Sequence, residues 1–285
     1  MIVLCRQHKK CDYHIPFHYL CSKLFHMDKR SLFLIFLLLC LASMTFSQNI
    51  TDEQGRKQGH WAKKYPNGNL MYEGTFKDDR PVGLFRRYNN EGILLSELNY
   101  SDKNDEAGAV FFYPDGTKAA EGTYVERKKE GLWKFYSGTQ PSYLAGEEYY
   151  TGDVRNGLSQ KYYPDNTLAE MVTWDKGNRT GEWLQYYPDG TVCLRAEYIA
   201  GKLEGLFSYY HPSGKLYYEG NYKNDFRTGD WMVFNYDDSL KQIIAYEEGK
   251  PSDPKLADQE TEFLDQLEKN RDKIEIVDVT GTTIK

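Results

Sequence analysis

The chain has 285 residues, a formal net charge of −6 and an aromatic content of 15%, with 24 tyrosines. This acidic balance argues against a surface that binds nucleic acid or anionic membranes, because binding to either is favoured by clustered lysine and arginine. We therefore expect no nucleic-acid partner, and membrane contact only through the N-terminal segment.

Residues 1–26 differ in composition from the rest of the chain, and we interpret them as an upstream extension, with translation starting at Met27. They hold three of the five cysteines, Cys5, Cys11 and Cys21, and four of the six histidines. Thiolate and imidazole are the ligands that zinc prefers, but the paired C-x2-C spacing of a zinc knuckle is missing. The sequence therefore predicts no metal site.

Residues 27–47 have the layout of a secretory signal peptide. Lys29 and Arg30 precede an apolar stretch, and a short polar segment ends near Ser47. The apolar stretch has about 12 to 16 residues, fewer than the roughly 20 that span a bilayer comfortably. We expect export to the periplasm, the cell envelope or the medium. The alternative is a chain anchored by residues 31–47.

The part after Ser47 keeps 30 of the 36 basic and 40 of the 42 acidic residues, a net charge of −10. Its one cysteine, Cys193, excludes an intramolecular disulfide there. A lipid on Cys40 is disfavoured, because Leu39 is not the small residue that such a site wants. A repeat array, however, needs no disulfide.

Residues 48–58 read as a linker, and 59–249 as eight repeats of 23 to 26 residues. Each unit begins at a glycine: Gly59, Gly83, Gly108, Gly131, Gly157, Gly181, Gly205 and Gly229. An aromatic residue follows two positions later in six of them: Trp61, Phe85, Trp133, Trp183, Phe207 and Trp231. A later aromatic column holds Phe76, Tyr100, Tyr124, Tyr150, Trp174, Tyr198, Tyr222 and Tyr246.

The unit at Gly181 reads as a β-hairpin. Trp183 to Tyr187 is aromatic and extended, and Pro188-Asp189-Gly190 supplies a fixed φ, a turn-forming carboxylate and a glycine free to take positive φ. A second strand runs from Thr191 to about Ile199. The irregular turn at 137–142 in the fourth unit reads as a tolerated insertion.

Because a lone hairpin is marginal in water, the units must pair edge to edge. The sequence thus predicts an all-β repeat protein: an elongated antiparallel meander of about eight β-hairpins, mostly single-layer. A half-exposed sheet suits tyrosine, which packs its ring and leaves its hydroxyl wet.

A column of acids could form a cation-binding stripe: Glu73, Glu97, Glu121, Glu147, Glu170, Glu197, Glu219 and Glu247. Adjacent members would lie about 9 to 10 Å apart, too far to share one calcium ion. We expect instead that basic residues on the neighbouring strands pair with them: Lys63, Arg86, Lys134 and Lys161.

Residues 250–285 break the period. A proline-containing linker precedes a predicted helix over 256–273, and 274–279 alternates like a strand. An open sheet edge invites pairing with another chain, so this tail is predicted to cap the array. The alternative is a docking element for a partner.

Catalytic signals are missing. The chain after Ser47 has two histidines, His60 and His211, and carries no G-x-S-x-G elbow, phosphate loop or H-E-x-x-H motif. We therefore predict a protein that is not an enzyme, with no catalytic residues and no cofactor.

The candidate binding surface consists of Trp61, Trp133, Trp183, Trp231, Tyr187 and Tyr210. Periodic aromatic residues are commonly the packing residues of a repeat, and the alternative is a stacking platform for glycans or peptides.

The unit G-x-W-x-x-Y-Y-P-D-G, followed by E-x-Y, resembles the MORN-repeat variant of bacterial proteins grouped as YwqK-type antitoxins. Residues 181–198, 59–76 and 205–222 carry the resemblance best. It implies a MORN-like fold and a scaffolding or protein-binding role, and the antitoxin name implies neutralisation of a toxin. The predicted export departs from an antitoxin that acts in the cytosol.

The leading hypothesis is a non-enzymatic, exported β-repeat scaffold that binds a protein partner. The alternative is a glycan- or cell-wall-binding module that uses exposed aromatic residues. Exposed acids beside a hydrophobic stripe would favour the protein partner. A shallow groove floored by coplanar aromatic rings would favour the glycan.

Overall fold

The computed structural model of the protein describes residues 49–102, 105–139, 141–253 and 259–270. The extension predicted for 1–26, the signal predicted for 27–47 and the strand predicted for 274–279 lie outside these residues.

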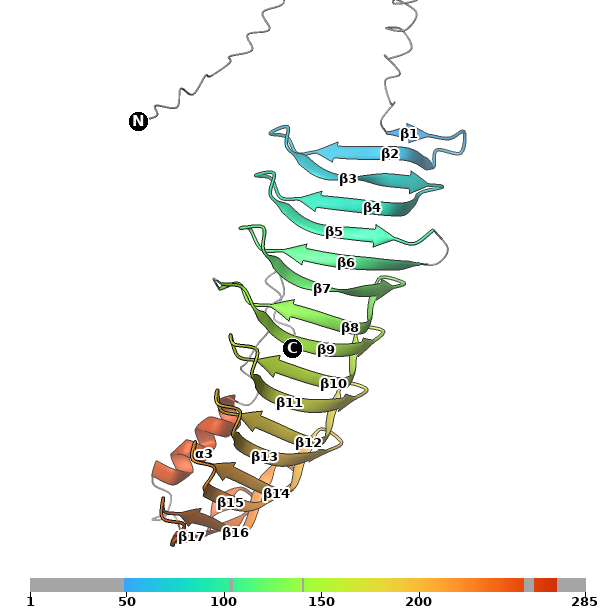
Figure 1. The fold of residues 1–285 in the computed structure, drawn as a ribbon. Helices are drawn as coiled ribbons and strands as arrows, with labels where there is room; N and C mark the ends of the chain where they lie inside the picture. The colour runs from blue at the N-terminus through green and yellow to red at the C-terminus, as the bar shows by residue number, and fades with distance from the viewer. Residues whose placement is uncertain (1–48, 103–104, 140, 254–258, 271–285) are drawn as a thin grey trace, which may run out of the picture. The chain divides into compact units, whose positions relative to one another are not determined.

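Within the described residues, eighteen strands form one antiparallel sheet in which each strand pairs with the next along the chain (Figure 1). The first nine are β1 (Ile50–Thr51), β2 (Lys57–Lys64), β3 (Leu70–Lys77), β4 (Arg80–Tyr88), β5 (Leu94–Tyr100), β6 (Glu106–Phe112), β7 (Lys118–Val125), β8 (Lys128–Tyr136) and β9 (Leu144–Thr151). The others are β10 (Val154–Tyr162), β11 (Leu168–Asp175), β12 (Asn178–Tyr186), β13 (Val192–Ile199), β14 (Lys202–Tyr210), β15 (Leu216–Lys223), β16 (Phe226–Phe234), β17 (Leu240–Glu247) and β18 (Lys250–Pro251). The predicted hairpin meander is confirmed.

Two kinds of turn alternate along the sheet, except between β5 and β6, where five residues separate Tyr100 from Glu106. The turn after β12 is the predicted Pro-Asp-Gly turn: Gly190 has a φ of 85°, and its amide donates to the Tyr187 carbonyl at 2.9 Å. The turn after β13 has two residues, Ala200 and Gly201, with φ of 50° and 87°. Positive φ at both positions matches the right-handed twist of the flanking strands. These short turns explain why one hairpin leads directly into the next.

The two-residue turns also join successive repeats. The second turn residue donates its amide to a carbonyl at the start of a strand one repeat earlier, for example Asp225 to Leu203 at 3.1 Å. The Asp225 carboxylate then accepts the Leu203 amide at 3.0 Å. Asp79 and Asp153 repeat this return bond with the amides of Lys57 and Lys129. Each turn is therefore held by its neighbour as well as by its own strands.

One face of the sheet, here called the inner face, carries a ladder of aromatic rings. Trp231 contacts Tyr222 and Tyr246 edge to face, with ring centroids 5.3 and 5.9 Å apart. Its ring also lies over Gly220, where an added Cβ would meet it at 2.2 Å. Gly74 under Phe85 and Gly122 under Trp133 repeat this arrangement. The opposite face is called the outer face below.

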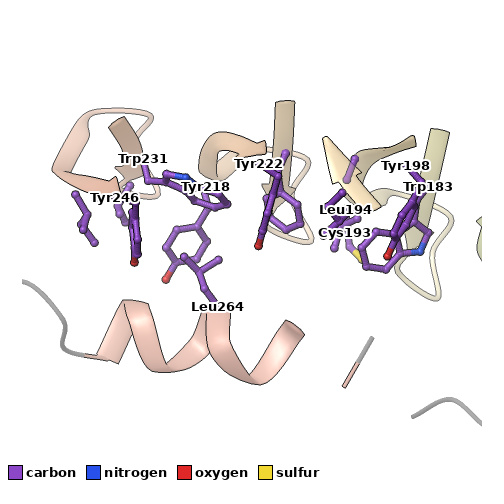
Figure 2. Close-up of a cluster of buried hydrophobic side chains, with 14 of the residues drawn as sticks. Trp183, Cys193, Leu194, Tyr198, Tyr218, Tyr222, Trp231, Tyr246 and Leu264 are labelled. Atoms are coloured by element: carbon purple, nitrogen blue, oxygen red, sulfur yellow. The ribbon is translucent and has the colours of Figure 1, made fainter. Parts of the chain in front are cut away.

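The helix α3 (Gln259–Asn270) covers part of the inner face (Figure 2). Leu264 is 1% exposed and belongs to the same buried cluster as Trp231, and Phe263 stacks on Tyr218 with centroids 5.6 Å apart. Asp265 pairs with the buried guanidinium of Arg227. The predicted C-terminal helix is thus present, between the predicted bounds of 256 and 273.

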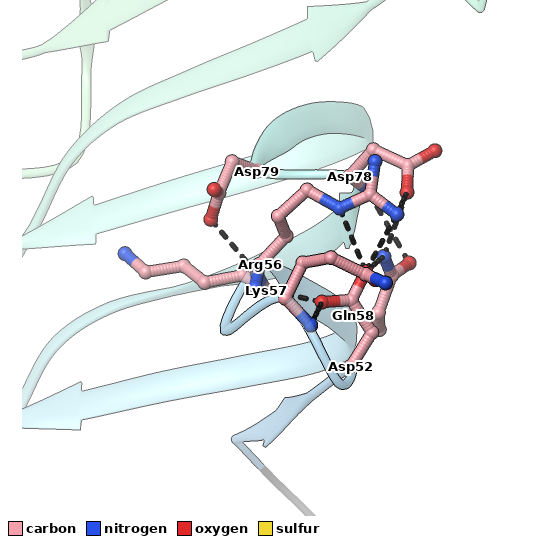
Figure 3. A network of polar contacts seen from close by, with 7 residues as sticks. Asp52, Arg56, Lys57, Gln58, Asp78 and Asp79 are labelled. Atoms are coloured by element: carbon pink, nitrogen blue, oxygen red, sulfur yellow. Dashed lines mark hydrogen bonds and ion pairs between the residues drawn. The ribbon is translucent and has the colours of Figure 1, made fainter.

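A polar network joins the segment before β2 to the first two-residue turn (Figure 3). Arg56 pairs with Asp52 at 2.7 Å and with Asp78 at 3.0 Å, while Gln58 donates to both carboxylates at 3.1 and 2.9 Å. Together with β1, which pairs with β2, this network places part of the predicted linker in the sheet.

Candidate functional site

The six candidate surface residues differ in exposure. Trp133, Trp183 and Trp231 are 1%, 5% and 1% exposed, so these three pack inside the ladder and do not form the exposed surface that was expected. They are buried because each ring lies against the neighbouring repeat on the inner face. Trp61 is half-buried and remains accessible at the N-terminal end of the ladder.

Tyr187 and Tyr210 are half-buried and bonded to each other. The Tyr187 hydroxyl donates to the backbone carbonyl of Tyr210 at 2.6 Å, one repeat further on. The same bond recurs from the hydroxyls of Tyr65, Tyr113 and Tyr163 to the carbonyls of Tyr88, Tyr136 and Tyr186. This column of tyrosines therefore ties adjacent long turns together.

The aromatic rings next to Trp61 meet edge to face. Trp61 meets Phe76 at an interplanar angle of 73°, and Phe76 meets Phe85 at 87°. Edge-to-face contact is the arrangement that the ring quadrupoles favour within a core. A sugar stacks on a flat ring face, so these three rings do not form the coplanar floor that the glycan hypothesis requires.

A row of cations at the beginning of the first strand of a repeat was missed in the sequence. The guanidinium groups of Arg155 and Arg179 lie 4.9 and 5.2 Å from the Trp174 ring, on which both make cation–π contacts. Lys57, Lys129 and Arg227 make equivalent contacts. The signal was available: these residues recur with the period of the repeat, two positions before the repeat glycine.

Several acids of the predicted column pair with basic residues of neighbouring strands on the outer face, as the sequence predicts. Arg86 pairs with Glu97 at 2.8 Å, and Lys134 with Glu147 at 3.2 Å, each directly across a strand pair. Hydrogen bonds from Lys118 and then Tyr136 lower the pKa of Glu121. Lys63 is an exception, since it lies opposite Tyr72 on the inner face.

The predicted acid column is interrupted in the second half of the sheet, at Glu170 and Glu197, and resumes at Glu219. Glu170 faces inward beside Trp183, is 5% exposed, and binds Lys161 at 2.7 Å. Glu197 lies directly opposite Glu182 and Glu204 on the outer face. Glu170 lies one residue from the column position, which moves its side chain to the other face of the strand, and Glu197 lies two residues from it on the same face.

Buried charge concentrates at the junction of the fourth and fifth repeats. Glu148 is 3% exposed and accepts hydrogen bonds from the Tyr150 hydroxyl and from Arg155, the latter at 3.1 Å. Burial, together with the Glu148 charge, raises the pKa of Tyr150. Ser159 stands here where other repeats place an aromatic ring. The carboxylate is thus paired, and the cluster is a structural one.

The outer face is open along its length. Large apolar side chains stand on it at Leu84 (43% exposed), Tyr149 (44%), Leu206 (53%) and Ile243 (47%). The exposed acids Glu182 and Glu197 lie between Tyr149 and Leu206 in strand order. A shallow depression of about 370 Å³ lies beside Leu84 and over Gly108, which has no side chain to fill it.

Little in the described residues points to covalent chemistry. Cys193 is buried, and burial raises the pKa of its thiol to about 11, so it is held as the unreactive neutral form. No group of three His, Cys, Asp or Glu side chains in the described ranges is placed to hold a metal ion. None of the helices described there is long and apolar enough to cross a membrane.

Comparison with known proteins bears on the repeats. The family model described as "MORN repeat variant" matches residues 57–78, 81–102, 179–200 and 203–224. Four of the hairpins therefore match the MORN repeat variant in sequence. The matched segments are the β2–β3, β4–β5, β12–β13 and β14–β15 hairpins, so each MORN repeat is one hairpin of the meander.

No curated protein sequence matches the chain. Among solved structures, one similar chain belongs to "Crystal structure of GtfA/B complex bound to UDP and GlcNAc", at 13% sequence identity and a TM-score of 0.17. The match covers 61% of this chain and 28% of that one. So low a TM-score carries no argument about function.

Proposed function

We propose that the protein is a non-enzymatic, exported β-repeat scaffold whose outer face binds another protein. The observation that carries this proposal is the group of exposed apolar side chains on the outer face, Leu84, Tyr149, Leu206 and Ile243, with the exposed acids Glu182 and Glu197 on strands between Tyr149 and Leu206. Exposed apolar side chains interspersed with charge on one face suit a protein partner, which can bury the former and pair with the latter.

The competing glycan module is less well supported. Three of the four candidate tryptophans are buried, and the rings near Trp61 meet edge to face. Export is proposed from the signal-like pattern of residues 27–47. The resemblance to YwqK-type antitoxins suggests a partner that is neutralised by binding, and co-expression with a toxin encoded nearby would test that narrower role.

The test is photo-crosslinking of the full chain in its native cells. A photoreactive residue at Leu206 or Leu84 is expected to capture one protein, and the same residue at the exposed turn position Ser213 should not. Substitution of Tyr149 by Ser should weaken capture at Leu206. N-terminal sequencing of the captured chain, with a start near Gln48, would support export.

Three results would contradict the proposal in whole or in part. Equal capture at Ser213 and Leu206 would mean that the outer face has no specific partner. Co-purifying polysaccharide without a protein would favour the glycan module. An intact Met27 start would replace secretion by anchoring through residues 31–47.

A further inference from the structure

The inner face carries one feature that the outer-face proposal does not use: the place where α3 sits has a counterpart near the other end of the sheet. Under α3, three residues lie side by side on adjacent strands, Tyr209, Tyr218 and Val233. Phe263 of the helix packs on this row, 5.3 Å from the Tyr209 ring and 5.6 Å from the Tyr218 ring. The row is therefore the floor of a helix-binding site.

The equivalent row in the first repeats is Lys63, Tyr72 and Arg87. The same central position holds Ser96, Ala120, Gly146, Glu170, Leu194 and Gln242 in the other described repeats. A tyrosine thus stands at the centre in two places, at Tyr218 beneath the helix and at Tyr72. Tyr218 is 1% exposed, whereas Tyr72 is half-buried.

The flanking residues set the chemistry of the second site. Lys63 and Arg87 are exposed on either side of Tyr72, and no carboxylate in the described ranges makes an ion pair with either. A third cation of the inner face, Lys57, lies at the other end of β2, about 20 Å along the strand from Lys63. Its ammonium lies 4.9 Å from the Trp61 ring and points away from the polar network of Figure 3. The inner face of β2 and β4 thus carries three cations on a chain with ten more acids than bases after Ser47.

Aromatic surface is available beside these cations. Tyr72 stacks on Phe85 with centroids 5.3 Å apart and an interplanar angle of 24°. Both rings are half-buried, as are Trp61 and Phe76. A ring from a docked helix would cover Tyr72 as Phe263 covers Tyr218.

The segment seen on the inner face is itself acidic. The sequence of α3 is QETEFLDQLEKN, in which four carboxylates surround the apolar pair Phe263 and Leu264. Its Asp265 pairs with Arg227, a member of the same cation row as Lys57. This face therefore holds a helix by two kinds of contact. A carboxylate of the helix pairs with a cation of the sheet, and an aromatic ring of the helix packs on an aromatic ring of the sheet.

We propose that Lys57, Trp61, Lys63, Tyr72, Phe85 and Arg87 form a second helix-docking site, occupied by an acidic amphipathic helix of a partner protein. The helix carries an aromatic residue for Tyr72 and carboxylates for Lys63 and Arg87. The opposite charges of the helix and the site fix the orientation of the helix and speed its binding, while the contact between the aromatic rings buries apolar surface. This site lies on the opposite face of the sheet from the exposed apolar residues of the proposed function, so its test is independent of that function.

The experiment uses the full chain and, as probe, a fluorescent peptide with the sequence of residues 254–272, followed by anisotropy. The tethered α3 keeps its own site occupied, because an attached helix has a far higher effective concentration than a free peptide. Binding by the free peptide thus reports another site. The charge reversal Lys63→Glu with Arg87→Glu is expected to weaken it about tenfold or more. Both side chains are exposed, so the fold should be unaffected.

The matched control reverses two exposed lysines of the outer face, Lys77→Glu with Lys223→Glu, for the same change in net charge. The control should leave binding unchanged, and replacing Phe263 by Ser in the peptide should abolish it. Absence of binding, or equal loss in both double variants, would overturn the proposal. If sedimentation shows that the natural chain self-associates and that the variant with Lys63→Glu and Arg87→Glu does not, the occupant of the site is a second copy of this chain. Binding of oligogalacturonate in place of the peptide would make it an acidic glycan.

Discussion

At the scale of single residues, three large rings of the ladder pack closely only because a glycine lies beneath each of them. Trp231 lies on Gly220, Trp133 on Gly122 and Phe85 on Gly74, all on the adjacent strand. Glycine in a strand usually weakens it, and its presence there marks a close approach. These glycines are therefore required by packing and not by backbone conformation, unlike the glycines of the turns.

Replacing Gly220 by Ala tests this requirement. The new Cβ would lie 2.2 Å from the Trp231 ring, so the buried indole must move, and we expect a loss of about 1 to 3 kcal/mol in the free energy of unfolding. Gly108→Ala is the control, because that glycine is an exposed strand residue with no atom within 4 Å of the added Cβ. Chemical denaturation followed by tryptophan fluorescence gives both values. Equal values for the two variants would show that the ring adjusts without cost.

At the scale of elements, the long turns carry carboxylates that hold the backbone. Asp165 and Asp189 accept hydrogen bonds from the amides of Thr167 and Thr191, both at 2.9 Å, and these backbone bonds lower the pKa of each carboxyl. The pKa of Asp237 is lowered by the Ser239 hydroxyl and then by its amide. A pKa lowered by folding stabilises the folded state above the ordinary value of 3.8, and this contribution is lost as the pH falls through the folded value.

The acid sensitivity of these turns can therefore be removed. In the triple variant with Asp165, Asp189 and Asp237 replaced by Asn, the side-chain oxygen still accepts the amide bond but no longer titrates. Between about pH 5 and pH 2, the melting temperature should fall less in the variant than in the natural chain. All three turns are exposed, so the difference will be small and needs parallel scans in one buffer series. An equally steep fall would mean that other carboxylates govern acid unfolding.

The helix α3 owes its position to contacts with the sheet. Its 12 residues are too few for a stable isolated helix, so packing of Phe263 and Leu264 must supply its stability. Leu264→Ala should destabilise the docked helix by about 2 to 5 kcal/mol and speed hydrogen exchange of its amides. Gln266→Ala is the control, because Gln266 is exposed on the same helix. If exchange is the same in both variants, Leu264 does not hold the helix.

At the scale of the whole molecule, the repeat period was enough to predict the meander, because spacing and turn chemistry determine strand direction and pairing. The period did not determine which face each residue occupies. The fourth turn carries extra residues, and Ser159 replaces an aromatic residue in the fifth repeat. Glu170 lies four positions after the turn residue Asn166, whereas Glu73 lies five after Gly68, so Glu170 faces the other side of the sheet. The burial of Trp133 also depends on Gly122 of the neighbouring strand, a long-range contact that no local pattern contains.

The same irregularity divides the core. One buried cluster spans β6 to β9 and includes Phe135, and the other spans β11 to β17 with α3 and includes Ile244. Between them lie the buried carboxylate of Glu148 and the partly buried guanidinium of Arg155 in place of a stacked ring. Repeat arrays are held together by contacts between neighbours, so an interruption of the ring contacts should weaken coupling along the sheet.

We therefore predict that the two halves of the core respond separately to mutation. Phe135→Ala should cost about 3 to 5 kcal/mol and Ile244→Ala about 2 to 5 kcal/mol, each confined mainly to its own cluster. Hydrogen exchange resolved by strand should show loss of protection in β6 to β9 for the first variant and in β14 to β17 for the second. Each variant serves as the control for the other, since both residues are buried, at 2% and 1% exposure. Uniform loss across all strands in both variants would instead mean that the sheet unfolds as one cooperative unit, with Glu148 and Arg155 transmitting stability as well as the aromatic rings do.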